Sequence, residues 1–130
     1  MPTISLRRFS NPDTLKHISD RHLIELLSPH QEFLKKRGFH LPATVSSGSI
    51  DHEALANIFM APDTDMPKEL ADALFYIDEM SSKEMMDELL ESAKDNRIDL
   101  ELGSDPEPAD VAVRLWLRDK TLLEEIHAEQ

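Results

Sequence analysis

Apolar residues recur along most of the chain with the period of amphipathic helices. The clearest example is the segment from Pro67 onward, where Leu70, Leu74 and Ile77 fall on one helical face and Phe75 widens it. Capping residues and prolines suited to a first helical turn precede several such patterns. The sequence therefore predicts an all-α fold of about seven or eight short helices in an orthogonal array.

The first half of the chain contains four of these predicted helices. They begin near Asn11, Asp20, Ser28 and Asp51. Ser28 and Gln31 have the spacing of a capping box. Gly38 is expected to end the third helix, because a residue without Cβ accepts the left-handed conformation at that position. Residues 40–49 contain Pro, Gly and serines without helical periodicity and predict a loop.

The second half predicts further helices with stronger patterns. Ser81 and Glu84 form a second capping box, followed by apolar residues on one side of a helix. A helix that begins at Pro108 is apolar on most sides, so we expect it to be central. Asp119 is expected to cap a last helix.

One segment has a different period. Residues 98–102 alternate between apolar and acidic side chains, which is typical of a half-buried strand. The comparable segment is residues 3–6. Two interpretations remain open: a small two-stranded ribbon between residues 3–6 and 98–102, or an extended segment that packs on the helices.

The length of 130 residues suits a single helical domain over residues 1–130. Charge is distributed unevenly along this domain. Residues 1–40 contain seven Lys and Arg against four acids, and residues 41–130 contain seven against 22. We therefore distinguish a basic region (1–40), the loop (40–49) and an acidic helical region (50–130). The acidic excess disfavours nucleic acid and anionic membranes as partners.

Targeting signals and cysteine chemistry are missing from the sequence. The chain has no cysteine, and its longest apolar stretch, Ala73 to Ile77, is too short to span a membrane. We expect a soluble, cytoplasmic protein. The last pattern has no stop signal before Gln130, which leaves two interpretations: the chain is the N-terminal domain of a longer protein, or it ends in a frayed natural terminus.

Familiar catalytic motifs are also missing. With three glycines the chain has no glycine-rich nucleotide loop and no nucleophile elbow. It contains no H-E-x-x-H motif, and no two histidines lie four residues apart on one helix. The sequence therefore predicts no catalytic residue, no metal site and no cofactor, and we expect that the protein is not an enzyme.

Two groups of residues are candidates for contacts with a partner. The first is a set of basic and histidine residues that could receive an anion: His17, Arg21, His30, Lys35, Lys36 and Arg37. The alternative, which we favour, is that the basic region docks on the acidic remainder of the same chain. The second is a set of adaptable apolar side chains that could form a groove for a partner helix: Phe75, Met80, Met85 and Met86. Here too we favour the interior alternative, in which methionines fill gaps in the core.

The leading functional hypothesis is a non-catalytic helical domain for protein interaction or regulation, with a protein partner or self-association. The alternative is an enzyme or ligand-binding domain of unfamiliar type with an anion site in the basic region. A weaker alternative is nucleic-acid binding by residues 1–40.

Overall fold

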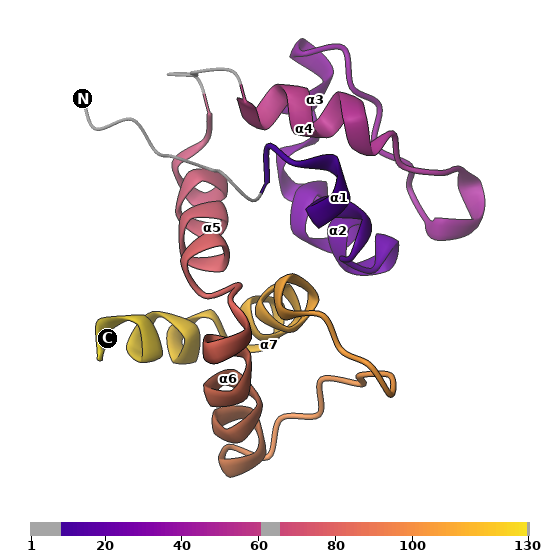
Figure 1. The fold of residues 1–130 in the computed structure, drawn as a ribbon. Helices are drawn as coiled ribbons and strands as arrows, with labels where there is room; N and C mark the ends of the chain where they lie inside the picture. Colours follow the sequence, from indigo (N-terminus) through magenta and orange to yellow (C-terminus); the bar gives the residue numbers. More distant parts are fainter. Residues whose placement is uncertain (1–8, 61–65, 130) are drawn as a thin grey trace.

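The protein is described by a computed structural model that places residues 9–60 and 66–129. The helices of this part are α1 (Pro12–Lys16), α2 (Asp20–Leu27), η1 (Ser28–His30), α3 (Gln31–Lys36), η2 (Val45–Ser47), α4 (His52–Met60), α5 (Lys68–Glu79), α6 (Lys83–Asp95) and α7 (Pro108–Ala128). Figure 1 shows α1 to α4 gathered at one end of the molecule and α5 to α7 at the other. The predicted all-α fold is confirmed.

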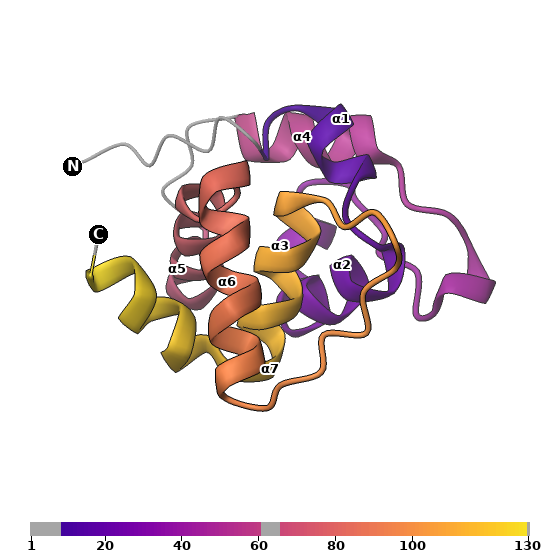
Figure 2. The same ribbon diagram turned by 60° about the horizontal axis from the view of Figure 1, so that its bottom comes forward.

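Local capping explains where several helices begin. The Asn11 side chain accepts a hydrogen bond from the Asp13 backbone N–H at 2.9 Å, which caps α1. Asp51 caps α4 in the same way, through a 3.1 Å bond from the Ala54 N–H. α1 packs against α4, and Figure 2 shows the two helices side by side. Both caps follow the sequence-based prediction.

The junction of α2 and α3 differs from the prediction. Ser28 does not cap a new helix, because its hydroxyl donates back to the Ile24 carbonyl at 2.7 Å and the chain continues through η1 into α3. The predicted capping box between Ser28 and Gln31 is therefore wrong. The end of α3 is as predicted: Gly38 has a φ of 79°, and the Phe39 N–H bonds the Leu34 carbonyl at 2.9 Å.

The start of α6 is displaced by one residue from the prediction. Ser82, rather than Ser81, is the N-cap, and its hydroxyl oxygen accepts from the Met85 N–H at 3.1 Å. Ser81 is buried, and its hydroxyl donates to the Ile77 carbonyl at the end of α5. Since the cap moves by one position, Glu84 no longer stands at the third helical residue and the predicted capping box does not form.

α7 is the central helix of the second group, as predicted. It packs against α2, α5 and α6, and Val111, Ala112 and Val113 are completely buried. Asp119 has non-helical angles (φ −155°, ψ 86°) and accepts a 3.1 Å bond from the Leu122 N–H. It therefore caps a second helical segment, which turns away from the first (Figures 1 and 2).

Residues 98–102 form no strand, and the described part of the chain contains none. Leu100 is buried, while Glu101 has a φ of 53°, which interrupts an extended conformation. The packed-segment interpretation therefore holds for this stretch. The ribbon partner proposed for it, residues 3–6, lies outside the described residues.

The buried apolar side chains of both groups of helices join into one cluster that extends from Phe9 to Ile126. Residues 40–49 form the expected loop, in which η2 is a single exposed turn. The hydrophobic cluster holds α5 and α7 side by side, and this pairing places the candidate site.

Candidate functional site: an aromatic face on α5 and α7

Four ring side chains meet where α5 packs on α7. We call the set of Phe75, Tyr76, Trp116 and His127 the aromatic face. Tyr76 stacks on Trp116 with ring centroids 5.7 Å apart and planes 21° apart. His127 meets Tyr76 edge to face at 5.2 Å and Phe75 at 5.6 Å. The rings therefore form one continuous cluster drawn from α5 and from both segments of α7.

The aromatic face lies at the surface of the protein. Phe75 is 36% exposed, and Tyr76, Trp116 and His127 are partly exposed. Trp116 and Tyr76 are the only tryptophan and the only tyrosine in the chain. Large rings of this kind dominate the energetics of protein interfaces because they bury much area at little cost in conformational entropy.

The bend at Asp119 positions one of the rings. Trp116 lies before the bend and His127 near the end of the second segment. Because the second segment turns away from the first, His127 reaches Phe75 and Tyr76. Asp119 therefore acts as a positioning residue for the aromatic face, through its cap on the second segment.

Acidic side chains lie beside the rings. Asp72 and Glu79 are exposed on α5, and each lies three or four residues from Phe75 and Tyr76, the spacing of neighbours on one helical face. Glu124 lies three residues before His127. Lys120 is the one base at this spacing from a ring. The border of the aromatic face is therefore mainly negative.

The four residues of the predicted partner groove differ in their exposure in the structure. Met80 is 1% exposed and belongs to the core, so it is wrong as a candidate for a surface groove, and the favoured interior alternative holds for it. It is buried because it follows directly on the apolar side of α5 at the turn into α6. Met85 and Met86 are half-buried against the same core, and Phe75 alone of the four is a large exposed side chain.

Sequence reasoning missed Tyr76, Trp116 and His127 as members of a surface site. The four remaining phenylalanines are buried: Phe9, Phe33, Phe39 and Phe59. The available signal was the presence of the only tyrosine and the only tryptophan in two predicted helices, those that begin near Pro67 and at Pro108. Their contact joins residues 40 positions apart, which no local pattern predicts.

The six predicted anion-site residues do not gather in one place. His17 lies 3.8 Å from Glu107, and Arg21 lies 3.7 Å from Glu25. The first contact fits the favoured alternative, in which the basic region docks on the acidic remainder, whereas Arg21 and Glu25 both belong to the basic region. Lys35 is exposed, and His30 is half-buried.

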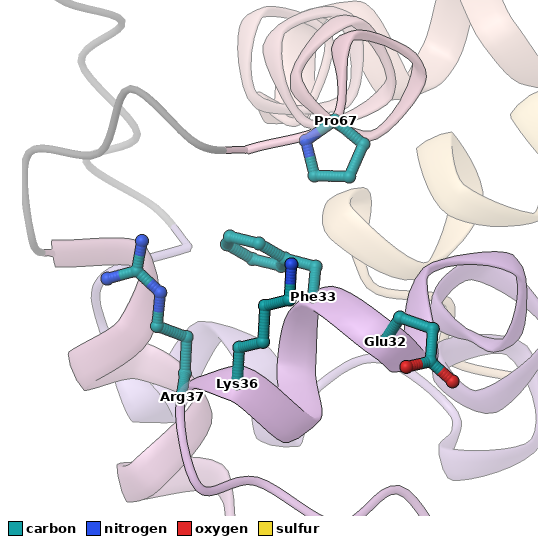
Figure 3. Close-up of a pocket in the computed structure, with 5 residues that line it drawn as sticks. All are labelled: Glu32, Phe33, Lys36, Arg37 and Pro67. Carbon is teal, nitrogen blue, oxygen red and sulfur yellow. The ribbon is translucent and has the colours of Figure 1, made fainter.

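The remaining two of the six, Lys36 and Arg37, line a groove between α3 and the start of α5. Glu32, Phe33 and Pro67 complete its lining (Figure 3), and its volume is about 740 Å³. Arg37 also lies over the Phe33 ring, 5.3 Å from its centroid.

A buried ion pair connects α7 to its neighbours. Arg114 donates from Nε to Asp110 at 2.9 Å and from Nη1 to the carbonyls of Leu100 and Glu101 at 2.9 and 2.6 Å. Asp110 also accepts a 3.0 Å bond from the Ser19 N–H, at the start of α2. The pair thus satisfies backbone groups in two distant segments, and its role in this arrangement is structural.

His22 is buried next to this pair. Burial lowers the pKa of His22 below its ordinary value of 6.5, and the Arg114 guanidinium lowers it further, although Asp110 and Glu25 oppose the shift. Its Nδ1 has no hydrogen-bond partner among the residues that the structure describes. Burial likewise lowers the pKa of His30, against a smaller opposing effect of Glu69.

Within residues 9–60 and 66–129, no three His, Asp or Glu side chains are placed to hold a metal ion. None of the helices in these ranges is long and apolar enough to cross a membrane. Comparison of the chain with protein-family models, with curated proteins and with solved structures gave no match.

Proposed function

We propose that this protein is a non-catalytic interaction domain whose aromatic face docks a basic, amphipathic segment of a partner protein. The observation that carries the proposal is the partly exposed stack of the only tryptophan and the only tyrosine, with the exposed Phe75 beside them. Apolar rings at the surface do not gain the full stabilisation that burial would give. Clusters of such rings usually mark an interface with a partner.

The charge of the surrounding helices supports a basic partner. α5 carries one lysine against four acids, and the segment from Asp119 to Glu129 also carries one lysine against four acids. Lysine or arginine side chains of a partner would meet Asp72 and Glu79 at the edge of the rings, where a cation also interacts favourably with aromatic faces.

The partner chemistry follows from these two features. The rings favour large apolar anchors, and the acids favour cations around them. A helix with leucine-like residues on one side and lysine or arginine at its margins has both. The docking mode that fits is therefore a helix laid with its apolar side on the aromatic face.

Trp116 provides a direct assay, because it is the only tryptophan and belongs to the aromatic face. The probe is a synthetic helical peptide of leucine and lysine without tryptophan, and the reference is the same pattern with glutamate in place of lysine. We expect saturable, one-to-one changes in Trp116 emission with the lysine peptide and none with the glutamate peptide. Phe75→Ala should weaken binding by about tenfold or more, as expected for loss of an aromatic anchor.

A matched pair of charge variants separates local recognition from general attraction. Asp72→Asn with Glu79→Gln removes two acids beside the rings. Glu91→Gln with Asp95→Asn removes two exposed acids from the end of α6 that lies away from α5 in Figure 1. We expect binding to weaken about threefold or more with the first pair and to change little with the second.

Three outcomes would overturn the proposal. Emission that changes without saturation, or equal losses in both charge variants, would mean non-specific attraction. Emission that changes on dilution of the protein alone would place a second copy of the chain on the aromatic face instead of a basic partner. A cytoplasmic location remains a prediction from the sequence.

A further inference from the structure

His22 is a buried titratable side chain at the contact between the two groups of helices. It lies in the first turn of α2 and is 8% exposed. α2 belongs to the first group, and it packs against α7 of the second group. A change in the charge of His22 therefore acts on the contact that joins the two groups.

Hydrogen bonds across this contact hold the first turn of α2 on α7. The Ser19 backbone N–H donates to Asp110 Oδ1 at 3.0 Å, and Asp110 Oδ2 accepts from Arg114 Nε at 2.9 Å. The His22 N–H in turn donates to the Ser19 carbonyl at 3.0 Å. The backbone of His22 is thus joined to α7 through Ser19.

The neutral form of the His22 ring suits this place, and the charged form does not. Nδ1 is buried and has no hydrogen-bond partner within the described ranges. In neutral imidazole one nitrogen carries no proton, so Nδ1 can remain an acceptor without a donor, whereas in imidazolium both nitrogens are donors. Protonation would therefore bury an N–H group without an acceptor, which destabilises the contact.

The charges around the ring also oppose its protonation. Four charged groups of α2 and α7 act on His22: Arg114, Asp110, Glu25 and Arg21. Burial and then Arg114 lower the pKa of His22 from its ordinary value of 6.5, and the two carboxylates offset this only in part. The turns η1 and η2 also pack on α2. η2 has no ionisable side chain, and η1 has one, His30.

We propose that His22 is a pH-sensitive switch for the contact between the two groups of helices. A proton on the ring favours an open form, in which α2 has moved away from α7 and the ring is in water. The closed form has its full stability above the ordinary pKa of 6.5 and loses it as the pH falls below that value. The aromatic face stays intact in the open form, because it belongs wholly to α5 and α7.

The Ser19 N–H is a specific reporter of the open form. Its acceptor is 91 residues away in the other group, so this hydrogen bond breaks when the contact opens. Helices within each group keep their own backbone bonds in the open form. The amides of Phe59 in α4 and Leu74 in α5 therefore serve as references, one for each group.

Amide hydrogen exchange of the ¹⁵N-labelled protein measures the opening, and the protection factor removes the intrinsic pH dependence of exchange. We expect the protection factor of Ser19 to fall at least about threefold between about pH 7.5 and about pH 5.5. It should also stay at least about tenfold below those of Phe59 and Leu74, because the contact opens without unfolding of either group.

Three variants test the assignment to His22. His22→Gln and His22→Leu remove the titration, one with a polar and one with an apolar side chain, and in both the protection factor of Ser19 should change by less than about 1.5-fold between the two pH values. His30→Gln is the matched control, since burial also lowers the pKa of His30 but this residue belongs to η1. It should keep the threefold loss.

The proposal fails if the protection of Ser19 does not change with pH, or if the change persists in both His22 variants. It also fails if His30→Gln removes the change as fully as they do. Equal protection of Ser19, Phe59 and Leu74 would mean that the contact is lost only when the whole chain unfolds, which would overturn the switch as well.

Discussion

The two ends of the molecule use aromatic side chains in opposite ways. In the helices α1 to α4 and their flanking residues, the rings are interior: Phe9 and Phe59 meet edge to face at 6.1 Å and are 1% and 5% exposed. In α5 and α7 the core is made by aliphatic residues such as Leu70, Leu74 and Val111, all completely buried. Tyr76 and Trp116 pack against this core and remain partly exposed. An aromatic residue in an apolar helix therefore need not belong to the core. Where aliphatic side chains already fill the core, a ring at the surface can contact a partner.

The largest expected effect would test this contrast directly. Phe59→Ala should lower the free energy of unfolding by about 4 kcal/mol, because it leaves a cavity in the core. Phe75→Ala should lower it by about 1 kcal/mol or less, since its ring is partly in solvent. Urea denaturation followed by circular dichroism measures both, and equal losses would show that the aromatic face is part of the core.

The next effect concerns the connection between the two ends. Asp110 belongs to α7 but accepts a bond from the Ser19 N–H of the other group. Asp110→Ala should cost about 3 kcal/mol, because it leaves the largely buried charge of Arg114 without its carboxylate. Thermal unfolding by calorimetry gives the loss, and a separate transition would show that the two groups no longer unfold together.

A matched control for this variant is the exposed pair of Arg118 and Glu101, at 3.6 Å. Arg118→Met should change the free energy of unfolding by less than about 0.5 kcal/mol, since solvent screens such pairs. Comparable losses in the two variants would contradict a special role for Asp110.

The third prediction is the pH dependence of stability, and it arises in the basic region. Burial lowers the pKa values of His22 and His30 in the folded state from their ordinary value of 6.5. As the pH falls below about 6.5, the unfolded chain therefore binds protons at these positions before the folded protein does, and stability falls. Above that pH both states are neutral there, and neither residue contributes to the pH dependence.

The measurement is urea denaturation at a series of pH values. The quantity to compare is the slope of the free energy of unfolding against pH, rather than the free energy at any one pH. His22→Gln with His30→Gln should flatten the slope below pH 6.5, because a glutamine does not titrate. His17→Gln, at an exposed histidine, should leave more of the slope intact. If the slope is unchanged in the double variant, other groups cause it.

The smallest expected effects compare two helix ends. α3 ends with Gly38 at a φ of 79°, whereas α6 ends with Arg97 at a φ of 57° and the same backbone bonding pattern. Gly38→Ala should cost about 1 kcal/mol through backbone strain, because no atom lies near the added Cβ. Arg97→Gly should instead raise the melting temperature, by relief of that strain. Melting temperatures that fall in both variants would contradict this explanation.

Local capping made much of the fold predictable. Asn11, Asp51 and Asp119 cap helices as their sequence context indicates, because each cap joins atoms at most three residues apart. The two capping boxes were wrong because serine has a competing option. Ser28 and Ser81 donate back to carbonyls of the preceding turn, and sequence spacing does not distinguish that bond from a cap.

The candidate sites were predictable only in part. Phe75 was named from the sequence as a candidate for a partner groove, and it remains in the aromatic face. Met80 was kept as a candidate for a surface groove, beside the favoured interior alternative, because periodicity gives the face of a helix but not what covers it. Tyr76, Trp116 and His127 were missed for the same reason.

The sequence by itself determined the helical class, most helix starts, the loop at residues 40–49 and the division of charge, because these depend on contacts within a few residues or on composition. The tertiary structure alone decided that Tyr76 stacks on Trp116 and that Asp110 bonds to Ser19, 91 residues away. Such pairs form because α7 packs between other helices and bends at Asp119. Burial and long-range contact depend on which helix covers which face, and that is settled only when the whole chain has folded.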